Sequence, residues 1–74
     1  MEELGILYII GRNIKYYRTL TKWSQEELAF NAGVHRTYIG MIERAEKNVT
    51  ILSLEKIAKA LNVPIHCLIE NNNH

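Results

Sequence analysis

Two short helical segments joined by a glycine turn constrain the fold of this chain more than any other feature. The segment SQEELAFNAGVHRTYIGMIER opens on Ser24-x-x-Glu27, a capping box in which each side chain satisfies a backbone N–H of the other residue. Gly33 can adopt the left-handed conformation that closes a helix, so the first segment should end near Ala32. The second should cover about His35 to Arg44. A turn this tight makes two helices cross at a steep angle.

Apolar residues recur at helical spacing in the rest of the chain as well. The further helices expected are Ile6 or Ile10 to about Leu20, a segment from Ser53 (as N-cap) to Asn62, and Pro64 to about Ile69. The fold class predicted is therefore all-α, a compact five-helix bundle that contains a helix-turn-helix. Residues 1–74 are expected to form one domain, with a core over about 6–69 and a frayed tail at 70–74.

Composition narrows the class of protein without identifying a partner. The formal net charge is only +1, and the single cysteine, Cys67, excludes an internal disulfide and favours a reducing, cytoplasmic location. The apolar stretch LGILYIIG is far shorter than the ~20 residues that a membrane span needs. No metal-ligand spacing, glycine-rich phosphate loop or nucleophile beside a base is visible. We therefore expect no enzyme, no catalytic or metal site, no cofactor, no membrane association and no small-molecule ligand.

One face of the third predicted helix carries the candidate functional residues. On a helical wheel the core anchors Ile39 and Ile42 fall on one side. The other side forms a stripe of Arg36, Thr37, Gly40, Met41 and Arg44, with Tyr38 at its margin. A mid-helix glycine costs ~1 kcal/mol relative to alanine, which makes sense if something must approach closely. Arginine can pair with guanine, and threonine can contact any base. The alternative is a face that merely packs or meets water.

The segment quoted above, followed by SLEKIAKALNVP, resembles the helix-turn-helix of the Cro/CI-like (XRE-type) phage-repressor family over roughly Ile10 to Ile69. Within that family, RTYIGMIER followed by NVTILSLEKI is most similar to the controller proteins of restriction–modification systems, which usually carry an acid at the position of His35. The resemblance implies a sequence-specific, DNA-binding transcription regulator. It would bind a (pseudo)palindromic operator as a homodimer, with its third helix in the major groove of double-stranded DNA. An antitoxin-like protein-interaction module that also binds DNA is the alternative.

The resemblance also implies roles for single residues. Base reading is expected from Arg36, Thr37, Tyr38 and Met41. Phosphate contacts are expected from Gln25, Arg44, Asn48 and Thr50, and from Lys22, which replaces the glycine common before the second helix.

Two further sets of residues are expected to hold the protein together. Arg18 and Glu43 match a structural ion pair between the first and third helices of the family. The C-terminal part offers more apolar side chains than a six-residue helix can bury alone, and Leu68 is expected to close the core. The remaining three, Val63, Ile65 and Ile69, are assigned to a dimer interface.

Overall fold

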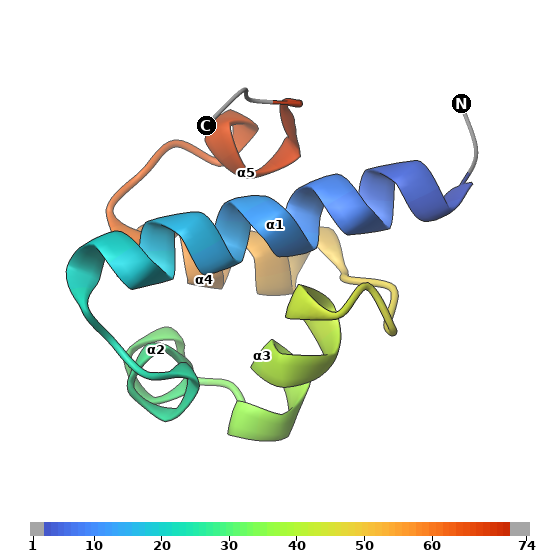
Figure 1. The fold of residues 1–74 in the computed structure, drawn as a ribbon. Coiled ribbons are helices and arrows are strands. Elements are labelled where there is room, and N and C mark those ends of the chain that lie inside the picture. The colour runs from blue at the N-terminus through green and yellow to red at the C-terminus, as the bar shows by residue number, and fades with distance from the viewer. Residues whose placement is uncertain (1–2, 72–74) are drawn as a thin grey trace.

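Helices make up all the regular secondary structure of residues 3–71, the part of the chain that this computed structural model describes (Figure 1). They are α1 (Glu3–Thr21), α2 (Gln25–Ala32), α3 (Arg36–Glu43), α4 (Ile51–Leu61) and α5 (His66–Ile69). The all-α, five-helix fold predicted from the sequence is confirmed.

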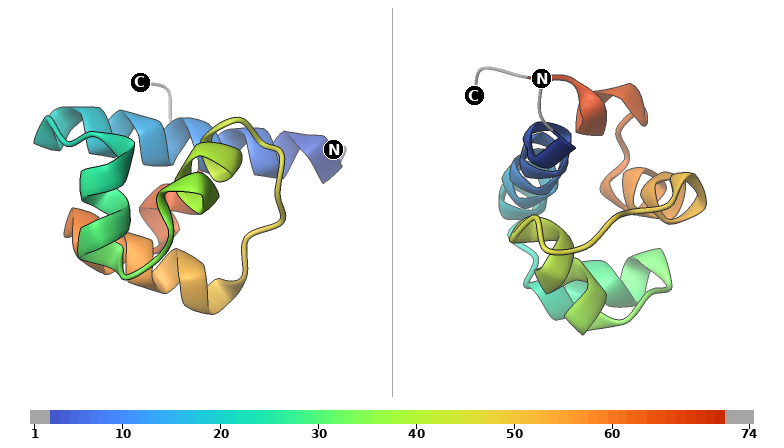
Figure 2. Two further views of the ribbon diagram at one scale, coloured as in Figure 1. Left: turned by 90° about the horizontal axis from the view of Figure 1, so that it is seen from below. Right: turned by 90° about the vertical axis from the view of Figure 1, so that its right-hand side faces the viewer.

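The long helix α1 lies between the two ends of the molecule. It packs against α3 on one side and against α5 on the other, while α2 packs against both α3 and α4. Figure 2 shows the α2–α3 pair on the opposite side of α1 from α5. All five helices contribute to one core, whose largest fully buried apolar side chains are Ile14, Leu28, Ile39, Ile42, Leu54, Ile57 and Leu68. One core therefore supports two separate faces of the molecule, the face of the α2–α3 pair and the face of α5.

Local capping defines the α2–α3 unit as predicted. Ser24 Oγ accepts a hydrogen bond from the Glu27 backbone N–H at 3.0 Å, and the Ser24 N–H donates to Glu27 Oε1 at 2.7 Å. Gly33 ends α2 in the left-handed conformation with φ 74°. A side chain would be strained at that φ, so glycine sets the short turn that aims α3 across α2.

The first helix begins earlier than predicted. It starts at Glu3 rather than at Ile6 or Ile10. The residues after Gly5 are almost uniformly apolar, so periodicity could not locate the start. Gly11 lies within this helix because α1 crosses α3 closely there: a methyl group at Gly11 would overlap the carbonyl oxygen of Ile42.

The last two helices also differ from prediction at their first residues. Ser53 is not the N-cap of α4; Thr50 is, and its Oγ1 accepts from the Ser53 backbone N–H at 3.1 Å. Asn62 ends α4, as expected, and its backbone is in the left-handed conformation. Pro64 precedes α5 in a turn, in which its carbonyl accepts from the Cys67 N–H at 3.0 Å. The proline therefore starts the turn rather than the helix.

The chain after α5 is held against α1. Asn13 is completely buried, and its Nδ2 donates to the carbonyl oxygens of Leu68 at 3.0 Å and Glu70 at 2.7 Å. Arg12 donates to Asn71 Oδ1 at 2.8 Å. Of the tail expected to be frayed at 70–74, Glu70 and Asn71 thus accept hydrogen bonds from α1, while 72–74 lie outside the described residues.

Candidate nucleic-acid interface

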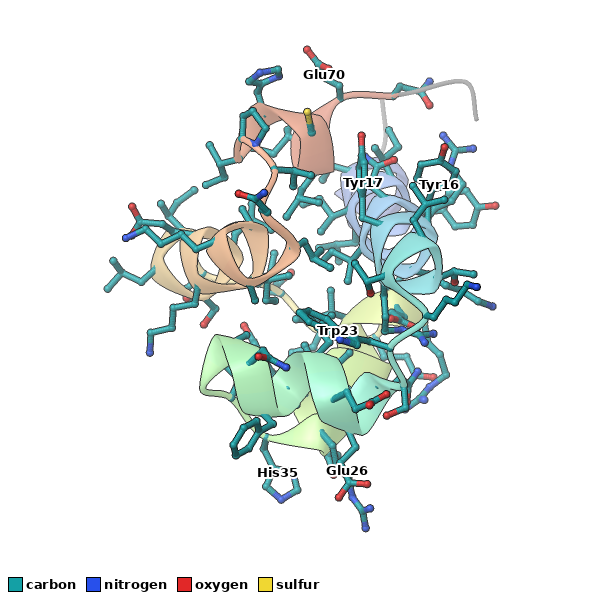
Figure 3. The ribbon with its side chains drawn as sticks, turned by 90° about the vertical axis from the view of Figure 1, so that its left-hand side faces the viewer. Tyr16, Tyr17, Trp23, Glu26, His35 and Glu70 are labelled. Carbon is teal, nitrogen blue, oxygen red and sulfur yellow. The ribbon has the colours of Figure 1, made fainter. Side chains whose placement is uncertain are left out.

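An open groove of about 630 Å³ lies where the first turn of α2 meets one face of α3. Its lining consists of Arg18, Ser24, Gln25, Glu26, Arg36, Thr37, Gly40 and Arg44. This side of the α2–α3 pair faces away from α5, and the labelled Glu26 and His35 project from its outer edge (Figure 3). The groove thus combines a helix N-terminus, where backbone N–H groups point outward, with arginine and threonine side chains.

A hydrogen-bonded cluster of Arg18, Gln25 and Glu43 lies behind the groove and fixes its geometry. Arg18 donates two hydrogen bonds to Glu43, from Nε at 2.6 Å and from Nη2 at 3.0 Å, and a third to the Trp23 carbonyl at 2.8 Å. Gln25 Nε2 donates to Glu43 Oε1 at 3.0 Å. The Arg18 and Glu43 side chains are only 14% and 4% exposed. Because the cluster spans α1, α2 and α3, it holds the N-terminus of α2 in register with the face of α3.

The position of Gly40 corrects the sequence analysis, which placed it on an exposed stripe. Gly40 is buried, because the first turn of α2 and the Arg44 side chain cover it. A Cβ atom at Gly40 would lie 3.1 Å from Arg44 Nη1 and 3.3 Å from Gln25 Oε1. The missing side chain therefore makes room for two groups of this chain, which lie side by side on the floor of the groove.

The first turn of α3 presents two exposed side chains to the groove. His35 is the N-cap, and its Nδ1 accepts a hydrogen bond from the Thr37 backbone N–H at 3.1 Å. The imidazole thus takes the capping role of the acid that the family resemblance leads us to expect at this position. Arg36 and Thr37 are exposed and line the same groove as Gln25. Base edges in a major groove could therefore meet both side chains while a phosphate meets α2.

The other two residues expected to read bases, Tyr38 and Met41, are half-buried. Tyr38 packs against the hydrophobic core. Only part of each side chain faces solvent, so contacts to sugar or to the edge of a base suit them better than deep insertion.

The remaining residues predicted to contact phosphate lie outside the groove but are exposed. Lys22 occupies the turn after α1 with φ 65°, a left-handed conformation that explains why glycine suits this position. Asn48 lies in the loop between α3 and α4. The Thr50 hydroxyl caps α4 as an acceptor, and its O–H can still donate.

Sequence reasoning missed the acids that face the groove arginines. Glu26 Oε2 lies 3.6 Å from Arg36 Nη1, and Glu46 Oε1 lies 3.1 Å from Arg44 Nε. Spacing could have indicated the second pair, since Glu46 follows Arg44 by two residues. The first joins different helices and depends on how α2 and α3 cross.

The residues assigned to a dimer interface lie on the α5 side. Val63 and Ile65 are half-buried and pack against the core, while Ile69 is 37% exposed. Ile69 is thus the member of the set that this chain covers least.

Between α1 and α5, burial raises the pKa of Tyr17, and a hydrogen bond with Cys67 acts in the same direction.

Within residues 3–71, no three His, Cys, Asp or Glu side chains come together as a metal site would need. None of the helices described has both the length and the apolar character for crossing a bilayer.

The sequence and the fold of this chain are similar to those of known helix-turn-helix proteins. A family model described as helix-turn-helix matches residues 14–66. The control protein C.SmaI of Serratia marcescens is 46% identical over 66 residues, which cover 89% of this chain and 79% of that protein. The crystal structure of the restriction–modification controller protein C.AhdI from Aeromonas hydrophila matches with a TM-score of 0.82 and 37% identity, over 84% of this chain and 94% of that one. The biofilm master regulator SinR, solved in complex with DNA, matches with a TM-score of 0.79 and 42% identity, over 82% of this chain and 98% of that one.

Proposed function

The chain belongs to the helix-turn-helix family, as its resemblance to Cro/CI-like regulators predicted, and we propose that it is a DNA-binding transcription regulator. In this proposal it acts in the cytoplasm as a homodimer, binds a (pseudo)palindromic operator and places α3 in the major groove. Since relatives such as C.SmaI and C.AhdI are control proteins, we propose further that it controls a restriction–modification system.

The groove between α2 and α3 is the observation that carries the proposal. It brings the N-terminus of α2 beside the exposed Arg36 and Thr37. A phosphate at the α2 terminus would accept from backbone N–H groups and from Gln25, which Glu43 orients. That contact sets the register of the duplex, after which α3 side chains reach base edges.

Each side chain then has a defined task. Arg36 would bond guanine O6 and N7 in a bidentate manner, worth ~1–3 kcal/mol of discrimination against another base. Thr37 would contact the neighbouring base, with Tyr38 and Met41 against sugars and base edges. Phosphate contacts would come from Lys22, Gln25, Arg44, Asn48 and Thr50.

A dimer supplies what one recognition helix lacks. One α3 spans only a few base pairs, so two copies on half-sites about one helical turn apart would read a longer sequence. We assign the contact between copies to the α5 side, through Val63, Ile65 and Ile69. That side is separated from the groove by α1, so this contact would leave the groove of each copy uncovered (Figure 2).

Selection of bound sites from a random DNA pool tests this function directly. The proposal predicts a symmetric consensus with two half-sites whose centres lie about one helical turn apart. Enrichment of no sequence at all would contradict sequence-specific binding. A single asymmetric half-site would contradict the paired arrangement.

A further inference from the structure

Every arginine that lines the groove is paired with a carboxylate of this chain. The three pairs are Arg18–Glu43 at 2.6 Å, Arg44–Glu46 at 3.1 Å and Arg36–Glu26 at 3.6 Å. A DNA phosphate approaching the groove therefore meets cations that are already partly neutralised. This agrees with a formal net charge of only +1 for the whole chain, which is low for a protein expected to bind a polyanion.

The three pairs differ in how readily DNA could replace the acid. The Arg18 pair is nearly buried and hydrogen-bonded on several sides, so it stays intact as part of the scaffold. The Arg36 and Glu26 side chains are 65% and 72% exposed, and they share the groove with Thr37. Glu26 is also distinct from Glu27, whose carboxylate is occupied in the cap of α2. Glu26 is thus an exchangeable anion that faces the main candidate for base reading.

We propose that Glu26 is a specificity-determining residue, which rests on the DNA-binding function proposed above. On DNA that lacks the right base, the Glu26 carboxylate keeps its contact with the Arg36 guanidinium. Where a guanine lies at the right position, its edge replaces the carboxylate as the partner of Arg36. Glu26 thereby keeps Arg36 from adding a phosphate contact to non-specific complexes.

Relative magnitudes support this exchange. An exposed ion pair is worth at most about fivefold in an equilibrium constant. A phosphate oxygen offers Arg36 another exposed anion, so leaving Glu26 for it gains little. A bidentate arginine–guanine contact is worth about 5- to 150-fold over a wrong base. Arg36 therefore leaves Glu26 for guanine and remains with Glu26 on random DNA.

The test uses Glu26→Gln, which removes the charge and keeps the shape. Dissociation constants are measured on the selected operator and on a scrambled duplex of equal length over a range of salt concentrations. On scrambled DNA we expect the variant to bind about two- to fivefold more tightly. Its plot of log K against log salt should be steeper by about 0.9, the slope of one more neutralised phosphate. On the operator the slope should not change, so discrimination between the two DNAs falls.

Two controls separate this role from a general charge effect. Glu55→Gln makes the same change in net charge at an exposed site on α4, outside the groove, and should leave the slope on scrambled DNA unchanged. Adding Arg36→Gln to the Glu26 variant should abolish the steeper slope, because no guanidinium remains to bind the phosphate. Circular dichroism of each variant checks that the helices are intact.

Three results would overturn the inference. They are equal effects of the Glu26 and Glu55 variants, a steeper slope that survives the loss of Arg36, and a loss of operator binding with no gain on scrambled DNA. The last would mean that Glu26 supports Arg36 within the specific complex. Failure of the proposed function looks different, since the unmodified protein itself would then bind operator and scrambled DNA equally.

Discussion

The groove side and the α5 side of α1 are both tied to that helix by polar side chains, but in opposite ways. On the α5 side, the buried amide of Asn13 donates to two backbone carbonyls and fixes the end of the chain. On the groove side only the inner pair of Arg18 and Glu43 is buried, while the outer arginines hold exposed acids. The α5 side therefore uses its polar groups for structure, whereas the groove side keeps exposed polar groups that a ligand can recruit.

Loss of the inner groove pair should have the largest effect on stability. Arg18→Ala leaves the Glu43 carboxylate nearly buried without its cation, so we expect the free energy of unfolding to fall by about 3 kcal/mol. Urea denaturation followed by circular dichroism measures it. Lys15→Ala, at an exposed site on the same helix, is the matched control. A loss under ~1 kcal/mol would mean that the pair is not structural.

The corresponding change on the α5 side should cost slightly less. Asn13→Ala removes the donor to the Leu68 and Glu70 carbonyls and opens a small cavity, so we expect a loss of about 2–3 kcal/mol. Asn71→Ala removes only an exposed hydrogen bond at the same junction and should be nearly neutral. Equal unfolding midpoints for the two variants would refute the assigned role of the buried amide.

Arg36→Ala should separate function from stability. Because its side chain is exposed, we expect an unfolding curve like that of the unmodified protein. Operator binding should weaken by ~1–3 kcal/mol, with little change on scrambled DNA. Gel-shift titrations on both duplexes measure this. Equal weakening on both would reassign Arg36 to a phosphate contact.

Gly40→Ala should give the smallest change, with opposite signs for stability and binding. Alanine favours the helix by up to ~1 kcal/mol, but the added methyl group presses on Arg44 and Gln25. We expect a higher melting temperature together with binding about two- to fivefold weaker on operator and scrambled DNA alike. Tighter binding of either duplex would show that the two side chains need no space at Gly40.

Sequence reasoning succeeded where the determinants are local. The Ser24–Glu27 box and the helix ends at Gly33 and Asn62 depend on neighbouring residues, and each lies where it was predicted. The start of α4 was wrong because Thr50 and Ser53 are both good caps, and the sequence does not rank them.

Features that depend on helix crossing could not be predicted from spacing. Gly40 lies on the outward side of its own helix and is buried because α2 crosses it and the Arg44 side chain covers it. For the same reason the contact between Glu26 and Arg36, ten residues apart on different helices, was missed. The surface of the groove thus needed coordinates, whereas the existence of a helix-turn-helix did not.

The most direct test of a base-reading face on α3 is to repeat the random-pool selection with Arg36→Ala and with Lys59→Ala, an exposed control on α4. We predict that the first variant loses its preference for guanine at one position of each half-site and keeps the spacing between them, while the control reproduces the original consensus. An unchanged consensus for Arg36→Ala would contradict base reading by this face of α3.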